Sequence, residues 1–209
     1  MGVIEPTELG LFPLSVVLLP GEVAPLHIFE ERYKLLFNEL MDGGEFGTIL
    51  VEEEGLRERG CSARLVQLIE RLDDGRLNVL VQGARRFRLL EIREPEDLGT
   101  TYLTGVVEFF DDDEPEAPQE LVAKALEAFR RMLLLMDVPS PRGPAGDGPL
   151  SFRLATAVEF GAPLKQDLLE AVSEQQRLET LLAIMETLLP RLELRRQREG
   201  AIRGNGKGH

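Results

Sequence analysis

Few residues of this chain have the type and spacing that covalent catalysis requires. There are two histidines, His27 in an apolar stretch and His209 at the C-terminus, and one cysteine, Cys61. A serine-type hydrolase needs a nucleophile oriented against a base, and an imidazole between Leu26 and Ile28 is more often a packed or rim side chain than such a base. Cys61 stands at the start of a predicted strand, where a cysteine is typically a small apolar filler. The sequence therefore predicts no catalytic residues.

Binding sites for phosphate, metal or a cofactor are not indicated either. Gly206-Lys207-Gly208 lacks the spacing, the hydroxyl and the preceding strand of a phosphate loop. A single cysteine allows neither an intrachain disulfide nor a thiolate zinc cluster. The segment DDDEPEAP at 111–118 is acidic enough to suggest a divalent-cation site, but it lacks the Asp-x-Asp-x-Asp-Gly spacing of a calcium loop, so we interpret it as a solvated linker. We expect no cofactor and no metal.

Composition bounds the class of protein. With 209 residues, 43% of them hydrophobic, the chain has room for one large domain or two small ones. A net charge of -13, from 37 acidic and 24 basic residues, argues against a broad phosphate-binding surface, so nucleic acid is an unfavoured partner. No apolar run reaches the roughly 20 residues of a membrane span, and no basic region precedes the first apolar run as in a signal peptide. We expect a cytoplasmic protein that does not enter a membrane.

The elements that would position any site begin with two extended apolar runs, 11–19 and 23–29, separated by Pro20-Gly21, which is a turn signal. Prolines in both runs indicate edge strands and corners of a small barrel. Apolar residues at helical spacing predict a helix over 30–41. Further strands are predicted at 46–51, 61–72, 76–81, 85–90 and 101–110.

The second half of the chain is predicted to be helical. Helices are expected at 119–136, 150–160 and 164–172, with a loop at 140–149. Ser173 and Gln176 have the spacing of a capping box that opens the last helix. Pro190 predicts a bend in that helix, because proline removes one backbone hydrogen bond.

Two motifs in the opening stretch resemble a known family. FPLSVVLLPGE at 12–22 and PLHIFEERY at 25–33 resemble the start of the N-terminal substrate-binding domain of the Lon family of ATP-dependent proteases. Several fixed offsets match at once, and the resemblance extends over about residues 9–194. The later matching residues are Gly60-Cys61-Ser62-Ala63, Asp74-Gly75, Gly83-x-x-Arg86-Phe87, Lys165-Gln166-x-Leu168-Leu169-Glu170 and Arg177-Leu178-Glu179.

The resemblance implies an α+β fold, in which an N-terminal PUA-like β-barrel is followed by a C-terminal α-helical bundle. We expect the barrel at 9–112, the helical subdomain at 119–196 and a disordered tail at 197–209. The chain resembles a stand-alone substrate-recognition domain, because it ends before the ATPase and Ser-Lys protease modules of full-length Lon could begin. It is therefore expected to be a bacterial, cytoplasmic protein that binds without catalysis.

The expected ligands are unfolded or damaged polypeptides, which expose apolar side chains and free backbone. A separate ATPase or protease is a further candidate partner. A receptor for such chains needs an apolar groove, with the 140s loop or the last helix as a candidate second wall. The predicted contact residues are Pro20, Val23, Pro25, Leu26 and Phe29.

One alternative keeps the same fold. Some PUA-like proteins bind RNA, and Arg85, Arg86 and Arg88 form a local basic cluster. In an acidic chain, such arginines often pair with nearby carboxylates instead. Binding to RNA at low salt would distinguish the two hypotheses.

Overall fold

The described chain divides into two compact units. The structure is a computed structural model that describes residues 6–95, 100–114, 116–137 and 148–205. The first unit, which we call the sheet unit, comprises the described residues up to Asp111 together with Val158–Glu170. The second, the helical unit, comprises the described residues of 112–157 and those from Ala171 onward. Within the described ranges, no helix combines the length and apolar character needed to cross a membrane.

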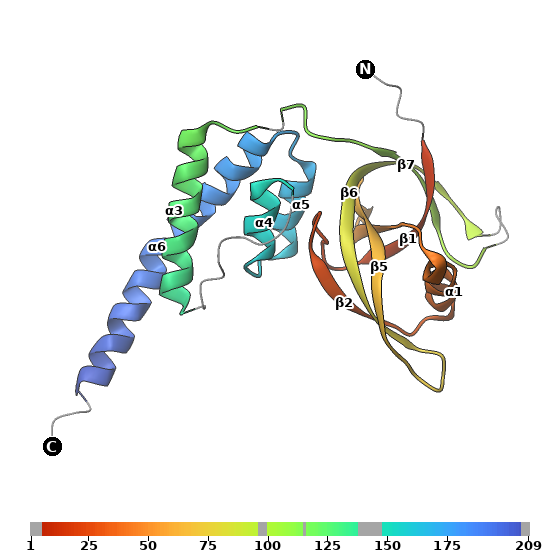
Figure 1. Cartoon of the computed structure of the whole chain (residues 1–209), viewed down its shortest axis with the longest axis horizontal. Coiled ribbons are helices and arrows are strands. Elements are labelled where there is room, and N and C mark those ends of the chain that lie inside the picture. Colours follow the sequence, from red (N-terminus) through yellow and green to blue (C-terminus); the bar gives the residue numbers. More distant parts are fainter. Residues whose placement is uncertain (1–5, 96–99, 115, 138–147, 206–209) are drawn as a thin grey trace. The chain divides into compact units, whose positions relative to one another are not determined.

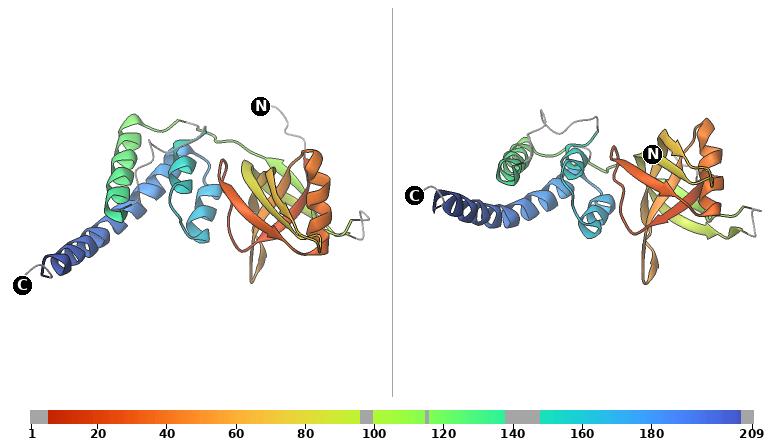
Figure 2. Two further views of the ribbon diagram at one scale, coloured as in Figure 1. Left: turned by 60° about the horizontal axis from the view of Figure 1, so that its bottom comes forward. Right: turned by 90° about the horizontal axis from the view of Figure 1, so that it is seen from below.

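The sheet unit is built on one seven-stranded sheet (Figure 1). Its strands are β1 (Thr7–Leu14), β2 (Val23–Ile28), β3 (Phe46–Glu52), β4 (Gly55–Leu56), β5 (Arg59–Arg71), β6 (Leu77–Arg93) and β7 (Thr104–Phe109). The pairing order is β1-β7-β6-β5-β3-β4, and β2 lies beside β6. Because β1 also pairs in parallel with β3, the strands β1, β7, β6, β5 and β3 form a closed ring of pairings. Figure 2 shows these strands curving around a common interior.

Aromatic side chains from β1 and the first helix fill part of this interior. Within the described ranges, the helices are α1 (Glu31–Glu39), the short 3-10 helix η1 (Leu40–Asp42), α3 (Gln119–Met136), α4 (Leu150–Thr156), α5 (Ala162–Glu170) and α6 (Glu174–Asn205). In α1, Tyr33, Leu36 and Phe37 are buried, as the helical spacing predicts. Phe12 of β1 meets the rings of Tyr33 and Phe37 edge-on, at centroid distances of 4.5 and 5.6 Å. Edge-on contact is a favoured arrangement of aromatic pairs, so α1 is fixed against the sheet.

Several strand boundaries differ from the prediction. β1 ends at Leu14 and does not continue to residue 19, although Val17, Leu18 and Leu19 are all buried. The strands predicted at 76–81 and 85–90 are parts of the single strand β6. Its ladder with β5 contains three register shifts, and such bulges let long paired strands bend.

The helical unit packs α3 and α4 against α6, and α3 and α6 lie side by side in Figure 1. The buried side chains include Phe129 and Leu133 of α3 and Leu178 and Leu181 of α6. Helix α6 continues through Pro190 to Asn205. The structure thus differs from the disorder predicted for 197–209, since 197–205 is helical and 206–209 lies outside the described residues. Most of the predicted 140–149 loop also lies outside them.

Residues 158–170 pack with the sheet unit, although the predicted helical subdomain at 119–196 contains them. The cause is a set of polar contacts from α5 to the sheet. The Gln166 side-chain amide donates to the Arg59 carbonyl oxygen at 3.1 Å, and Arg57 forms an ion pair with Glu170 at 3.0 Å. Gln166 and Glu170 belong to the Lys165–Glu170 segment that the family resemblance singled out, and their contacts attach α5 to the sheet.

Candidate functional site

The structure describes two of the residues considered for covalent chemistry, His27 and Cys61. His27 is exposed, and its Nδ1 lies 2.7 Å from the Asn78 side-chain oxygen, so the ring is fixed at the rim of the sheet. Cys61 is fully buried, and burial raises the pKa of its thiol to about 12, which keeps it protonated near neutral pH. Among the described residues, no group of three or more His, Cys, Asp or Glu side chains is placed to hold a metal ion.

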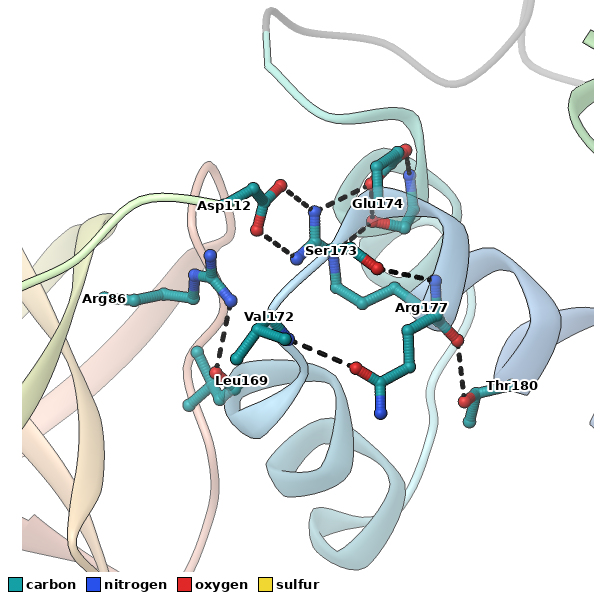
Figure 3. Close-up of polar contacts among 10 residues, drawn as sticks. Arg86, Asp112, Leu169, Val172, Ser173, Glu174, Arg177 and Thr180 are labelled. Atoms are coloured by element: carbon teal, nitrogen blue, oxygen red, sulfur yellow. Dashed lines mark hydrogen bonds and ion pairs between the residues drawn. The ribbon is translucent and has the colours of Figure 1, made fainter. Parts of the chain in front are cut away.

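The most deeply buried charged cluster of the described chain lies in the helical unit (Figure 3). The Arg177 guanidinium is completely buried and donates two hydrogen bonds to the Asp112 carboxylate, at 2.6 and 2.5 Å. It also donates to Glu174 at 2.8 Å, and its Nε donates to the Ser151 hydroxyl at 2.8 Å. Burial alone would lower the pKa of Arg177, but its hydrogen bonds to Asp112 and Glu174 and the negative charges of these carboxylates raise it, so the group stays charged.

The Arg177 cluster, which comprises Asp112, Ser151, Glu174 and Arg177, has a structural role. Ser151 has no exposed surface, and its hydroxyl donates to Glu174 at 2.5 Å, so no substrate can reach this serine. The cluster corrects the interpretation of 111–118 as a fully solvated linker. The Asp112 side chain is only 7% exposed, the Asp113 N–H donates to the Val172 carbonyl oxygen at 2.9 Å, and the Glu174 N–H donates to the Glu114 carbonyl oxygen at 3.2 Å. Asp112, Asp113 and Glu114 are therefore part of the helical unit.

A tight turn positions the strand that carries the predicted contact residues. The Glu22 N–H donates to the Leu19 carbonyl oxygen at 3.0 Å, and Gly21 has φ of 80°, as expected for the third residue of a type II turn with Pro20 before it. Gly83 of β6 donates to the Glu22 carbonyl oxygen and accepts from the Gly21 N–H, each at 2.9 Å. This pattern is a G1 bulge, with glycine in the left-handed conformation. The Pro20-Gly21 turn prediction is confirmed.

This turn lies beside an apolar hollow of about 340 Å³ in the sheet unit. Its apolar lining is contributed by the segment after β1, by β2 and by β6, and its polar lining by three charged residues and one threonine. The lining residues are Leu14, Val16, Val17, Leu18, Glu22, Ala24, Pro25, Leu26, Thr48, Val81, Glu159 and Lys165. Val16 is 56% exposed, so part of the wall is open to solvent. A hollow of this size and character can receive one or two apolar side chains.

The structure brings together two of the five predicted contact residues. Pro25 and Leu26 line the hollow, whereas Pro20, Val23 and Phe29 do not. Val23 and Phe29 are 52% and 61% exposed, and Pro20 is half-buried beside the turn.

Sequence reasoning missed most of the wall. Val16 and Val17 were included in a predicted strand, and nothing in their local pattern shows that the chain leaves the sheet before them. Glu159 and Lys165, which belong to the sheet unit, also line the hollow. The 140s loop, a predicted second wall, lies mostly outside the described residues. The one available signal was the family resemblance, which includes Lys165.

The edge of β2 is the second feature of this site. Among the described strands, β2 pairs with β6 alone. Glu22 faces β6 through the bulge hydrogen bond, and the direction of backbone groups alternates along an antiparallel strand. The backbone groups of Val23, Pro25 and His27 therefore point to the free edge. Since proline has no N–H, the edge lacks a donor at Pro25 and offers donors on either side of it.

Each arginine of the basic cluster of the RNA hypothesis has a partner within the sheet unit. Arg85 pairs with Glu45 at 3.3 Å, and Arg88 pairs with Glu108 at 2.7 Å. Arg86 is only 5% exposed and donates to the Leu169 carbonyl oxygen at 3.4 Å (Figure 3). Burial would raise the pKa of Glu45, but hydrogen bonds from Ser62 and Arg64 and the charge of Arg85 lower it, so it remains an anion facing the cluster. This arrangement does not favour phosphate binding.

Comparison with solved structures places this arrangement among Lon N-terminal domains. A Lon N-terminal domain protein from Xanthomonas campestris is similar with a TM-score of 0.66 and 30% sequence identity, covering 85% of this chain and 98% of that one. The N-terminal domain of the Mycobacterium avium complex Lon protease, at 20% identity, shares the fold with a TM-score of 0.63 over 86% of this chain and 98% of its own. The chain thus has the fold of a Lon N-terminal domain, which combines helices and strands and contains a β-sheet.

Curated relatives agree with the structural comparison. Lon protease 1 of Hydrogenovibrio crunogenus is 28% identical over 86% of this chain and 23% of its own length. Lon protease of Brevibacillus choshinensis is 29% identical over 91% of this chain and 26% of its own. The chain thus spans about a quarter of the length of these relatives. Residues 8–187 match the substrate-binding domain of ATP-dependent protease La (LON), and the chain therefore belongs to the LON substrate-binding domain family.

Proposed function

We propose that the sheet unit binds exposed apolar segments of unfolded or damaged polypeptides in the hollow beside β2. The observation that carries this proposal is the apolar hollow of about 340 Å³ with Pro25 and Leu26 in its wall. Membership of a substrate-binding family supports the same function. Val23, Phe29 and Pro20 complete the proposed contact surface, the first two as exposed apolar side chains on and next to β2.

The proposed binding mode combines side-chain insertion with limited backbone pairing. An extended polypeptide can hydrogen-bond to the free edge of β2 at Val23 and His27, while Pro25 leaves a gap between them. Affinity then depends mainly on side chains that enter the hollow. Pro25 also protects the edge against indiscriminate pairing with other strands, as prolines on edge strands commonly do.

The finer description of the fold is part of the proposal. The closed ring of strand pairings supports a PUA-like β-barrel over 9–112, and the packing of α3 and α4 on α6 supports a helical bundle within 119–196. We further propose that the chain binds without catalysis in the bacterial cytoplasm and that a separate ATPase or protease acts on the bound polypeptide. The names of the relatives, which are Lon proteases, support an association with proteolysis.

The alternative, RNA binding by the same fold, has little support because each arginine of the basic cluster has a partner in the sheet unit. RNA binding can be measured directly as the retention of labelled RNA on a filter at low salt. We expect no salt-dependent retention.

The experiment that tests the proposal compares two exposed valines. Val16 lines the hollow and is 56% exposed, and Val66 lies on β5, outside the lining, and is 54% exposed. Binding of a fluorescein-labelled, permanently unfolded protein, such as reduced and carboxymethylated α-lactalbumin, is measured by anisotropy. Val16→Asp is expected to weaken binding about tenfold, because it places a carboxylate in the apolar wall, and Val66→Asp to leave binding unchanged. Equal affinity of both variants and the unmodified chain would reject the hollow as the binding site.

A further inference from the structure

Two of the three charged residues that line the hollow, Lys165 and Glu22, are paired with each other. Lys165 forms an ion pair with Glu22 at 2.5 Å, and both side chains are largely buried, at 13% and 18% exposed. The second carboxylate oxygen of Glu22 accepts the Leu19 N–H at 3.0 Å. Both oxygens of Glu22 are thus engaged, and the one cation of the lining is neutralised.

Glu159 is the remaining charged residue of the lining. It is exposed and, within the part of the chain that the structure describes, has no hydrogen-bond or ion-pair partner. The hollow therefore combines an apolar wall with one unpaired negative charge. The net charge of the chain, -13, adds a long-range attraction for cations.

From this charge pattern we infer that the hollow selects polypeptide segments in which an apolar side chain is next to lysine or arginine. The inference rests on the proposed function and names the class of segment bound. The apolar side chain enters the hollow, and the neighbouring cation pairs with the Glu159 carboxylate at its mouth. A segment with aspartate or glutamate in that place is disfavoured, because like charges repel at close range.

Three labelled peptides test the inference. They share an extended leucine-containing core and differ in the residues flanking it, which are lysine, glutamine or glutamate. Anisotropy titration is expected to give affinities in the order lysine, glutamine, glutamate, with about fivefold between successive peptides at low salt. The difference should shrink as salt is added, because the charge at the mouth is exposed to solvent.

Two variants identify the responsible charge. Glu159→Gln is expected to reduce the preference for lysine over glutamate to less than half of its original ratio. Glu53→Gln, which removes another exposed carboxylate outside the lining, should leave the ratio unchanged. If all three peptides bind equally, or if Glu159→Gln retains the full preference, the inference is overturned while the binding function stands. If no peptide binds, the proposed function fails and the inference fails with it.

Discussion

Two ion-paired sites of this protein differ mainly in their contact with solvent. In the helical unit, Arg177 is fully buried, and Asp112 and Glu174 are 7% and 6% exposed. In the sheet unit, the Lys165–Glu22 pair borders a hollow, and its side chains are 13% and 18% exposed. The side chains of the first site have almost no exposed surface, and the second site shares its wall with apolar side chains such as Val16 that are open to solvent.

This difference assigns a role to each site. Removing one partner of a buried ion pair leaves the other charge buried without solvation, so the folded state depends on both partners. A pair at the edge of a hollow can exchange protein contacts for ligand contacts at small cost. We therefore expect substitutions in the Arg177 cluster to change stability, and those around the hollow to change binding.

The largest expected effect is that of Arg177→Met. It leaves the Asp112 and Glu174 carboxylates buried without their cation, and the free energy of unfolding should fall by about 3–5 kcal/mol in urea denaturation. Arg131→Met is the matched control, because Arg131 pairs with Glu193 in the same unit while its side chain is 58% exposed. The control should cost less than about 1 kcal/mol. Equal losses in the two variants would show that the cluster is not a special structural contact.

Gly83→Ala is expected to have an intermediate effect. A Cβ on Gly83 would lie 2.1 Å from the Leu19 carbonyl oxygen, so the turn before β2 must move. We expect a loss of about 1–3 kcal/mol of stability and weaker polypeptide binding, since the turn adjoins the hollow. Gly161→Ala serves as the control, because its Cβ would find only an ordinary contact at 3.6 Å from Pro163. Unchanged polypeptide binding in a folded Gly83→Ala variant would show that the position of the turn does not affect the binding site.

Lys165→Met should have the smallest effect on stability. Its loss removes an ion pair whose side chains are 13% and 18% exposed, at the edge of the hollow where water can reach the released carboxylate, and should cost about 1–2 kcal/mol. Releasing Glu22 adds a second unpaired carboxylate at the hollow, so the lysine-flanked peptide should bind more tightly than to the unmodified chain. A stability loss as large as that of Arg177→Met, or weaker binding of this peptide, would contradict the contrast between the two sites.

Local sequence signals predicted the parts that depend on neighbouring residues. Pro20-Gly21 predicted its turn. One half of the predicted capping box is present, because the Gln176 N–H donates to the Ser173 hydroxyl at 3.2 Å, while the Gln176 side chain accepts from the Val172 N–H. Residues Tyr33, Leu36 and Phe37 of α1 were likewise predicted to share a buried face. Each of these features depends on residues that are only a few positions apart in the sequence.

Features that depend on distant residues could not be predicted in the same way. The Asp112 side chain can be nearly buried because Arg177, 65 positions later, satisfies its carboxylate, whereas composition alone suggested a solvated linker. Lys165 reaches the hollow through Glu22, which lies 143 positions earlier. The wall at Val16 and Val17 exists because β1 stops at Leu14, and an uninterrupted apolar run does not reveal that boundary. These contacts are long-range, and short sequence patterns do not encode them.

The most direct measurement is an amide chemical-shift titration of the isotope-labelled chain with reduced, carboxymethylated α-lactalbumin. Binding in the hollow predicts that the largest perturbations fall on Val16, Ala24, Leu26 and Lys165, while the amides of Ser151 and Arg177 stay unchanged. Perturbations concentrated around Ser151 and Arg177, with the amides of the hollow unaffected, would contradict the assignment of binding to the sheet unit.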